Sequence, residues 1–215
     1  MESDFWHERW ANNQIGFHQD VTTPLLERHW DELFDSSVKS VFVPLCGKSR
    51  DLLWLAERGL EVVGVELSQT AVESFFAEQK LDARRGLHGE MREYRCASLP
   101  LTVYQGDFFA LSNDVFVTSD VVFDRGALIA LPRIMRRAYV EKFKSKLKPE
   151  ARILLMTLEH SDEKSPPFSV QESEIRDLYE DEFSVKRIDE EPEEFRGQLA
   201  TNVIYLLNRK QPVTL

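Results

Sequence analysis

"VFVPLCGKSRDLLWLAERGLEVVGVELS", from Val41 to Ser68, holds two apolar β-rich runs on either side of a helical pattern. The second run ends in an acidic residue, Glu66. A strand, a tight turn, a helix and a second strand with an acid at its tip are typical of nucleotide-binding sheets. The turn also carries Gly47-Lys48-Ser49, the last three letters of a phosphate-binding loop, so the stretch raises the question of which nucleotide binds.

The glycines that recognise phosphate are missing. A P-loop requires G-x-x-x-x-G-K-[ST], and the place of its first glycine is taken by Phe42, inside the first strand. The dinucleotide fingerprint G-x-G-x-x-G is also absent, since only Gly47 remains. The sequence therefore argues against an NTPase and against an NAD(P)-dependent oxidoreductase.

The spacing of the turn and the acid instead favours ribose recognition. Glu66 follows Gly47 by 19 positions, close to the roughly 20 that place a carboxylate on a ribose diol. A nucleoside without phosphates fits such a site, and the common one is S-adenosylmethionine, whose cationic sulfonium suits aromatic faces and an acidic protein. Two plainer interpretations stay open: Glu66 as an exposed strand-end carboxylate, and Gly47 as a turn glycine with positive φ.

Composition narrows the class of protein. The chain has 215 residues and a net charge of −10, which argues against nucleic acid or an anionic membrane as partner. Cys46 and Cys96 form neither a CxxC pair nor a disulfide framework, which indicates a reducing compartment. No signal peptide and no apolar run of about 20 residues is found, so we expect a soluble, cytoplasmic protein, with a monomer as the default.

The remaining pattern alternates strands and helices, which predicts an α/β fold with a mostly parallel sheet. Thr23 and Pro24 predict the N-cap and first position of a helix before the sheet, and Ser169 with Glu172 predicts a capping box. The polar segment 81–100 reads as a loop or short hairpin, and the acidic run 189–195 as a solvated loop. Seven strands are expected, over residues 40–45, 61–67, 101–107, 120–126, 151–160, 183–189 and 202–209.

Four segments resemble one known family. They are "FWHERWANNQIGFHQ", "VPLCGKSRDLLWLAERGLEVVGVELS", "QGDFF" and "FDRGALIALP", and they are similar to the bacterial branch of the thiopurine S-methyltransferase family. The resemblance covers nearly the whole chain and is weakest over 81–100 and after residue 161. It implies a Rossmann-like class I methyltransferase fold: a seven-stranded, mostly parallel sheet with the last strand antiparallel and helices on both faces. Residues 1–215 would form one domain, with an N-terminal lid and first helix over 1–36 and a catalytic core over 37–215.

The resemblance also assigns cofactor residues. Trp10 and Leu45 should line the cofactor pocket beside Gly47, and Glu66 should bind the ribose. In the "QGDFF" segment, Asp107 and Phe108 should lie near the adenine. Alternatives remain: Trp6 and Trp10 as a core stripe of a helix, and Asp107 as a turn or capping residue.

For the acceptor, the resemblance implies Phe17 as a contact and Arg125 between cofactor and acceptor, with Arg196 as the match to an arginine of the family's late loop. Arg125 ends an apolar strand, where an unpaired charge is costly, so it is either paired with an acid such as Asp124 or directed at the ligand. Phe17 could be core. His18 and the "EHSD" run at 159–162 could supply a base, or simply be polar packing and a strand exit.

The function implied is S-adenosylmethionine-dependent S-methylation of small aromatic or heterocyclic thiols such as 6-mercaptopurine, with S-adenosylhomocysteine as product. Arg125 would be the catalytic residue, because an ionised thiol needs an electrostatic partner more than a base. No Ser/His/Asp set and no metal-spaced cluster is apparent, so no metal is expected. Selenium or tellurium species, another small acceptor, a protein or nucleic-acid acceptor and a non-catalytic S-adenosylmethionine sensor remain as alternatives.

Overall fold

The computed structural model describes residues 3–162 and 164–210. By internal packing the chain divides into two compact units, Met1–Phe116 and Val117–Leu215, and each unit is described by itself. The expected single domain over 1–215, with a lid over 1–36, stays a prediction.

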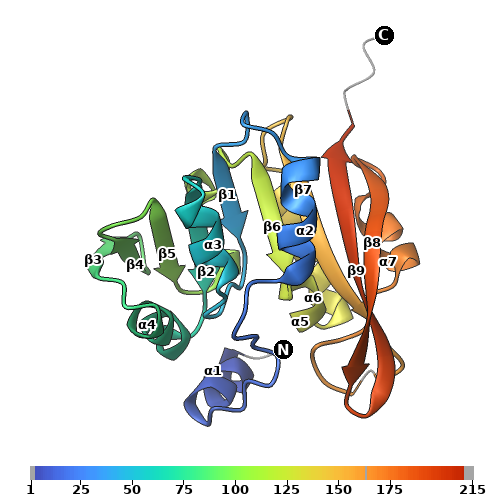
Figure 1. The fold of residues 1–215 in the computed structure, drawn as a ribbon, viewed down its shortest axis with the longest axis horizontal. Helices are drawn as coiled ribbons and strands as arrows, with labels where there is room; N and C mark the ends of the chain where they lie inside the picture. The colour runs from blue at the N-terminus through green and yellow to red at the C-terminus, as the bar shows by residue number, and fades with distance from the viewer. Residues whose placement is uncertain (1–2, 163, 211–215) are drawn as a thin grey trace. The chain divides into compact units, whose positions relative to one another are not determined.

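The first unit contains a five-stranded part of the sheet in the order β3-β4-β5-β2-β1 (Figure 1). β1 (Ser40–Val43), β2 (Glu61–Glu66) and β5 (Leu101–Gln105) are parallel. Helix α3 (Asp51–Glu57) joins β1 to β2, and α4 (Gln69–Glu78) follows β2. Because the strands are parallel, their carboxyl ends meet at one edge, where the turn at Gly47, the acid Glu66 and Asp107 all lie.

The β3–β4 hairpin extends this sheet. β3 (Ala83–His88) and β4 (Met91–Cys96) pair antiparallel, and β4 pairs antiparallel with β5. The sequence left segment 81–100 open between a loop and a hairpin, and the structure confirms the hairpin.

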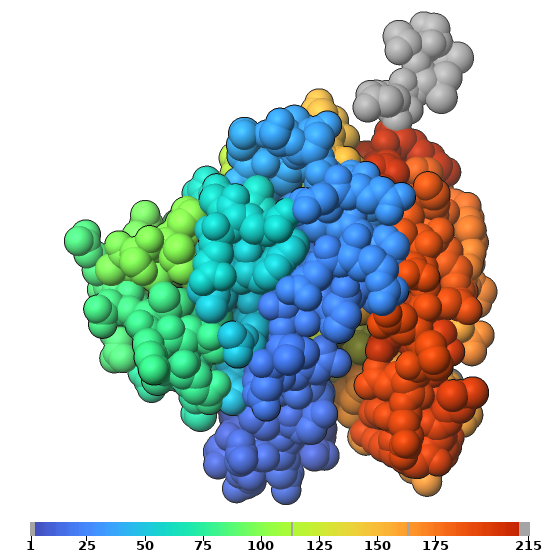
Figure 2. Space-filling model, viewed as in Figure 1, coloured from blue at the N-terminus to red at the C-terminus, as the bar shows by residue number. Residues whose placement is uncertain are grey.

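The N-terminal part of the first unit is helical. α1 (Ser3–Ala11) is followed by an irregular segment and by α2 (Pro24–Leu33), which buries Leu25, Leu26 and Trp30. Figure 2 shows this stretch as a dark blue surface that continues into the lighter blue of α2. Two short 3-10 helices, η1 (Phe108–Ala110) and η2 (Asn113–Val115), end the unit. In the described part of the chain no helix is both long and apolar enough to cross a membrane.

The second unit contains a four-stranded part of the sheet in the order β6-β7-β9-β8. β6 (Val121–Arg125) and β7 (Arg152–Glu159) are parallel, and β9 (Gln198–Arg209) is antiparallel to β7, as expected of the last strand. β8 (Phe183–Phe195) pairs antiparallel with β9. The helices of this unit are α5 (Ala127–Ala130), α6 (Arg133–Lys144) and α7 (Glu172–Tyr179).

Three sequence expectations are wrong. The described residues hold nine strands instead of seven, because β3 and β4 were not counted as strands. The acidic run 189–195 is part of β8, where Glu193 pairs with Ala200 in the ladder, so solvation of its side chains did not require a loop. The capping box fails as well: the N-cap of α7 is Gln171, and the Ser169 hydroxyl instead accepts a hydrogen bond from the His160 N–H at 3.1 Å.

Candidate functional site

The candidate site of the first unit is built on the turn after β1. Leu45 and Gly47 both have positive φ, +46° and +55°, which reverses the chain between the strand and α3. The Cys46 N–H donates to the Val65 carbonyl at 2.9 Å, and the Ser49 N–H donates to the Cys46 carbonyl at 3.1 Å. The first bond attaches the turn to β2, and the second lies within the turn itself.

Glu66 binds the turn directly. One carboxylate oxygen accepts the Gly47 N–H at 2.8 Å, and the other accepts the Ser68 N–H at 2.7 Å. Glu66 is 6% exposed, so it is not the exposed strand-end carboxylate that the sequence left open. Burial, the largest cause, raises the pKa of the Glu66 carboxyl, while the N–H groups of Ser68, Gly47 and Leu67 act in the opposite direction. Each oxygen keeps a further lone pair, so the carboxylate can still accept hydroxyl groups of a ligand.

The Gly-Lys-Ser letters do not form a phosphate cradle. The N–H of Gly47 is taken by a carboxylate, and the Lys48 ammonium binds both Glu78 oxygens at 2.8 and 3.0 Å. The Ser49 hydroxyl donates to Asp51 at 2.9 Å. A phosphate would meet a buried carboxylate instead of free N–H donors, so the geometry agrees with the sequence in excluding a P-loop.

Aromatic side chains from the N-terminal segment cover this turn. Trp10 is 7% exposed, and a Cβ placed on Gly47 would lie 3.1 Å from its Cζ2 atom. Phe17 packs edge-on against Trp10 and Trp6, with ring centroids 5.7 and 5.6 Å apart. His18 lies next to Phe17, with Nε2 3.2 Å from an oxygen of Asp20. The structure thus places Trp10 beside Gly47 and packs Phe17 on Trp10, while their roles toward cofactor and acceptor stay predictions.

The end of β5 joins the same edge. The Gly106 N–H donates to the Glu66 carbonyl at 2.9 Å. Asp107 is exposed and caps η1, accepting the Phe109 N–H at 2.9 Å, which confirms the capping interpretation without testing a role toward adenine. Phe108 is buried, 6.5 Å from Phe42 of β1 between ring centroids.

Cys46 lies in the turn as a free, buried thiol. Both cysteines are free and buried. Burial, followed by the charge of Glu66, raises the pKa of the Cys46 thiol well above its usual value. A protonated, buried thiol is a poor nucleophile and a poor target for oxidation.

In the second unit, Arg125 ends β6 and is half-buried. Within the part of the chain that the structure describes, no hydrogen-bond or ion-pair partner of its guanidinium is found. Asp124 does not neutralise it: that carboxylate accepts the N–H groups of Ala127 and Leu128, at 3.1 and 3.2 Å, and the Tyr139 hydroxyl at 2.6 Å. Arg125 is therefore a cation available to a ligand.

Arg196, by contrast, is fully engaged. It lies in the β8–β9 turn with φ +53°, and its guanidinium donates to Asp162 at 2.9 Å, to the Ser165 hydroxyl at 2.9 Å and to the Pro166 carbonyl at 2.8 Å. These bonds attach the turn to the loop that follows β7. A contact of Arg196 with the acceptor stays a prediction.

The "EHSD" run offers no free base. The His160 Nδ1 atom accepts the Asp162 N–H at 3.1 Å, so Nε2 carries the proton and donates to the Pro167 carbonyl at 3.1 Å. Both ring nitrogens are thus used in fixing the loop. In the described residues no group of three or more His, Cys, Asp or Glu side chains is arranged to hold a metal ion.

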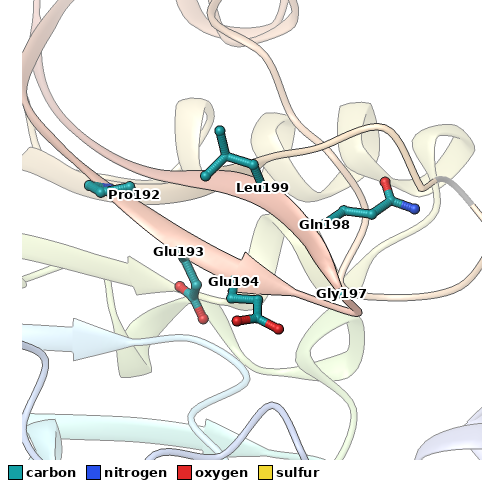
Figure 3. Close-up of a pocket in the computed structure, with 6 residues that line it drawn as sticks. All are labelled: Pro192, Glu193, Glu194, Gly197, Gln198 and Leu199. Carbon is teal, nitrogen blue, oxygen red and sulfur yellow. The ribbon is translucent and has the colours of Figure 1, made fainter.

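The β8–β9 hairpin also carries a hollow of about 370 Å³ (Figure 3). Two carboxylates, Glu193 and Glu194, are among its lining residues, and none of the predicted site residues is. Only one hairpin builds it, without an aromatic face, so it does not resemble a nucleoside site. Its lining residues are Pro192, Glu193, Glu194, Gly197, Gln198 and Leu199.

Sequence reasoning missed one residue of the first unit. Asp51 is 1% exposed and accepts hydrogen bonds from Thr23 and Ser49. Its place two residues after Ser49, at the start of an expected helix, was the only available signal.

Comparison with known proteins shows which family the chain resembles. The family model described as thiopurine S-methyltransferase (TPMT) matches residues 1–205. A thiopurine S-methyltransferase of Pseudomonas fluorescens (strain SBW25) is 47% identical over 181 residues, 83% of this chain and 82% of that protein. One of Aliivibrio fischeri is 44% identical over 182 residues, 83% of this chain and 83% of that protein.

Solved structures agree on the fold. The 1,6-didemethyltoxoflavin-N1-methyltransferase of Burkholderia thailandensis, bound to S-adenosylhomocysteine, has a TM-score of 0.69 at 13% identity, over 97% of this chain and 87% of that one. The magnesium protoporphyrin IX methyltransferase of Synechocystis PCC 6803 has a TM-score of 0.64 at 15% identity, over 95% and 97%. The fold is that of class I methyltransferases, the cofactor of the matched family is S-adenosylmethionine, and the chain belongs to the thiopurine S-methyltransferase family.

Proposed function

We propose that the protein methylates the sulfur of small aromatic or heterocyclic thiols, such as 6-mercaptopurine, with S-adenosylmethionine as donor. The observation that supports binding of S-adenosylmethionine is the Glu66 carboxylate, which is buried at the tip of β2 and accepts the Gly47 N–H. It leaves acceptor lone pairs for hydroxyl groups while occupying the N–H that a phosphate would need. Family membership supports the thiol half.

The cofactor supplies a methyl group on a cationic sulfur. Glu66 would orient it by accepting its ribose hydroxyls, and Trp10 and Leu45 would exclude water from it at the turn. Asp107 and Phe108 are proposed beside the adenine. These residues come from α1, from the end of β2 and from the segments that follow β1 and β5, all in one compact unit.

Arg125 is proposed as the catalytic residue. A thiolate acceptor requires no general base, but its negative charge must be held while its sulfur is positioned near attack distance. Arg125, whose guanidinium has no partner among the described residues, supplies a permanent positive charge for this. Phe17 and Arg196 are proposed as further acceptor contacts, Arg196 only if it exchanges its present partners for the acceptor.

The test titrates S-adenosylhomocysteine calorimetrically into wild type, Glu66→Ala and the matched control Glu61→Ala, which removes an exposed carboxylate from the start of the same strand. We expect Glu66→Ala to weaken binding roughly 10- to 100-fold, the loss of hydrogen bonds to a charged group. Glu61→Ala should bind like wild type. Equal affinity of all three proteins would overturn the cofactor assignment.

The acceptor half is tested by turnover of 6-mercaptopurine in the same preparations and in Arg125→Ala. We expect kcat/KM to fall roughly 10²- to 10³-fold in Arg125→Ala with cofactor affinity retained. Binding without turnover in wild type would point to another acceptor, such as a selenium or tellurium species, or to a sensor. We also propose that the protein is a monomer and that it is cytoplasmic. Light scattering of the purified protein tests the oligomeric state.

A further inference from the structure

Asp51 is a buried carboxylate held by neutral groups. It is 1% exposed, and among the residues that the structure describes no Lys, Arg or His forms an ion pair with it. Three neutral groups hold it instead: the Thr23 N–H at 2.8 Å, the Thr23 hydroxyl at 2.9 Å and the Ser49 hydroxyl at 2.9 Å. Burying a carboxylate is costly even when it is hydrogen-bonded, so an apolar residue would fill this place at lower cost if packing were the only requirement.

The groups that donate to Asp51 come from two segments of the chain, the turn after β1 and the N-terminal segment. Ser49 belongs to the turn that carries Gly47, and Thr23 is the residue at which the N-terminal segment enters α2. A second bond runs in parallel, from the Arg50 guanidinium to the Asp20 carbonyl at 3.3 Å. Residues 20–23 are thereby attached to residues 49–51.

The Thr23 hydroxyl is used for this attachment instead of its ordinary role. Thr23 occupies the N-cap of α2 with extended backbone angles, yet its side chain makes no capping hydrogen bond. A threonine N-cap ordinarily stabilises a helix because its hydroxyl accepts a free N–H of the first turn. Here the hydroxyl donates to Asp51, 28 positions away in the chain.

The other end of the N-terminal segment meets the same turn. Trp10 packs on Gly47, and Phe17 packs on Trp10. The segment between α1 and α2 is therefore held against the turn at both ends, by Trp10 at one end and by Asp51 at the other. Asp51 fixes where this covering segment, residues 12–23, ends.

We propose that Asp51 is a positioning residue that sets the place of the N-terminal segment over the cofactor turn, through Thr23. The inference rests on the proposed function, because it takes the turn to be the cofactor site. Without the bond, Trp10 and Phe17 would lose their fixed place, so ground-state binding of cofactor and acceptor should weaken more than the chemical step does.

The experiment uses Thr23→Val, which removes the hydroxyl at nearly constant volume, with Thr23→Ser as the conservative variant that keeps it. The matched control is Thr157→Val, because Thr157 is 1% exposed and its hydroxyl has no hydrogen-bond partner within the described part of the chain. The affinity for S-adenosylhomocysteine, KM, kcat and the melting temperature are measured for each protein. If Thr23→Val does not fold, Ser49→Ala removes a donor from the other side of the same carboxylate.

We expect Thr23→Val to raise the Kd for S-adenosylhomocysteine and the KM for S-adenosylmethionine about fivefold or more, with kcat within about threefold of wild type. Thr23→Ser and Thr157→Val should bind like wild type. In a Trp10→Ala background, Thr23→Val should raise the Kd for S-adenosylhomocysteine by less than about twofold, because the bond between Thr23 and Asp51 acts through the covering segment.

A lower melting temperature with unchanged Kd, or an equal effect of Thr23→Val with and without Trp10, would reduce Asp51 to a structural role and overturn the inference. If wild type binds S-adenosylhomocysteine but does not methylate thiopurines, the proposed acceptor is wrong. The Kd values of wild type and Thr23→Val still test the role of Asp51, so failure of the proposed function and failure of this inference are distinguishable. Wild type that binds no S-adenosylhomocysteine overturns the proposed function and this inference with it.

Discussion

Gly47 is the residue on which strand, turn and covering segment converge. Its φ of +55° is one that L side chains rarely adopt, its N–H is bonded to Glu66, and its missing Cβ leaves room for Trp10. The sequence alone allowed both a turn glycine and a cofactor glycine. The structure shows that the requirement is double: the backbone angle and the close approach of an indole.

Substituting Gly47 by alanine should therefore cost more than backbone strain alone. Gly89 is the matched control, because its φ is +60° and nothing lies within 4 Å of a Cβ placed there. We expect Gly89→Ala to lower the free energy of unfolding by about 1 kcal/mol and Gly47→Ala by about 2–3 kcal/mol, with the difference due to the contact with Trp10. Urea unfolding measures both values, and equal losses would contradict a close contact between Trp10 and the turn.

At the scale of elements, the end of β6 is organised by one carboxylate. Asp124 is fully buried, caps the start of α5 and accepts the Tyr139 hydroxyl of α6. Burial raises its pKa to about 6, against the opposing effect of the hydrogen bonds from Tyr139, Leu128 and Ala127. These bonds hold the turn at Gly126 that follows Arg125, so the direction of a proposed catalytic side chain depends on packing between three elements.

The raised pKa of Asp124 determines how the stability of the folded protein depends on pH. The folded protein binds a proton at Asp124 up to about pH 6, whereas the unfolded chain releases it near its usual value of 3.8, so stability from this group falls as pH rises between these values and is then constant. Removing the Tyr139 hydroxyl leaves the ionised form with one donor fewer and raises the pKa further. Tyr139→Phe should lower the free energy of unfolding by about 2 kcal/mol at pH 8 and by about 1 kcal/mol at pH 5.

Tyr179→Phe is the control for this prediction. Tyr179 is also fully buried, but its hydroxyl has no hydrogen-bond partner in the described residues, so its removal should cost little at either pH. Denaturant titrations at the two pH values make the comparison. A Tyr139→Phe loss that is the same at both would show that Asp124 is not the titrating group.

At the scale of the whole molecule, charge separates small-molecule from nucleic-acid acceptors. The chain has 27 Lys and Arg against 37 Asp and Glu, a net charge of −10. Nucleic-acid binding depends on neutralising phosphates, and an acidic chain repels them. We expect no retardation of duplex DNA or of transfer RNA in gels at low ionic strength, and salt-dependent binding would instead favour a nucleic-acid acceptor.

By itself, the sequence determined much of this protein: the parallel α/β order, the turn and the acid 19 positions later, the absence of a phosphate cradle, and the family. These follow from local patterns, since strand periodicity, turn glycines and short spacings are read within one segment. Only the tertiary structure decided the hydrogen-bond partners. Glu66 accepts the Gly47 N–H, and Asp51 joins Thr23 to Ser49. Arg196 is engaged, whereas Arg125 has no partner within the described ranges 3–162 and 164–210. The prediction of a loop over the acidic run 189–195 was wrong because partners in the chain decide its structure. Cross-strand pairing and burial are set by segments far apart in the chain, and they override the local preference of charged residues for a solvated loop.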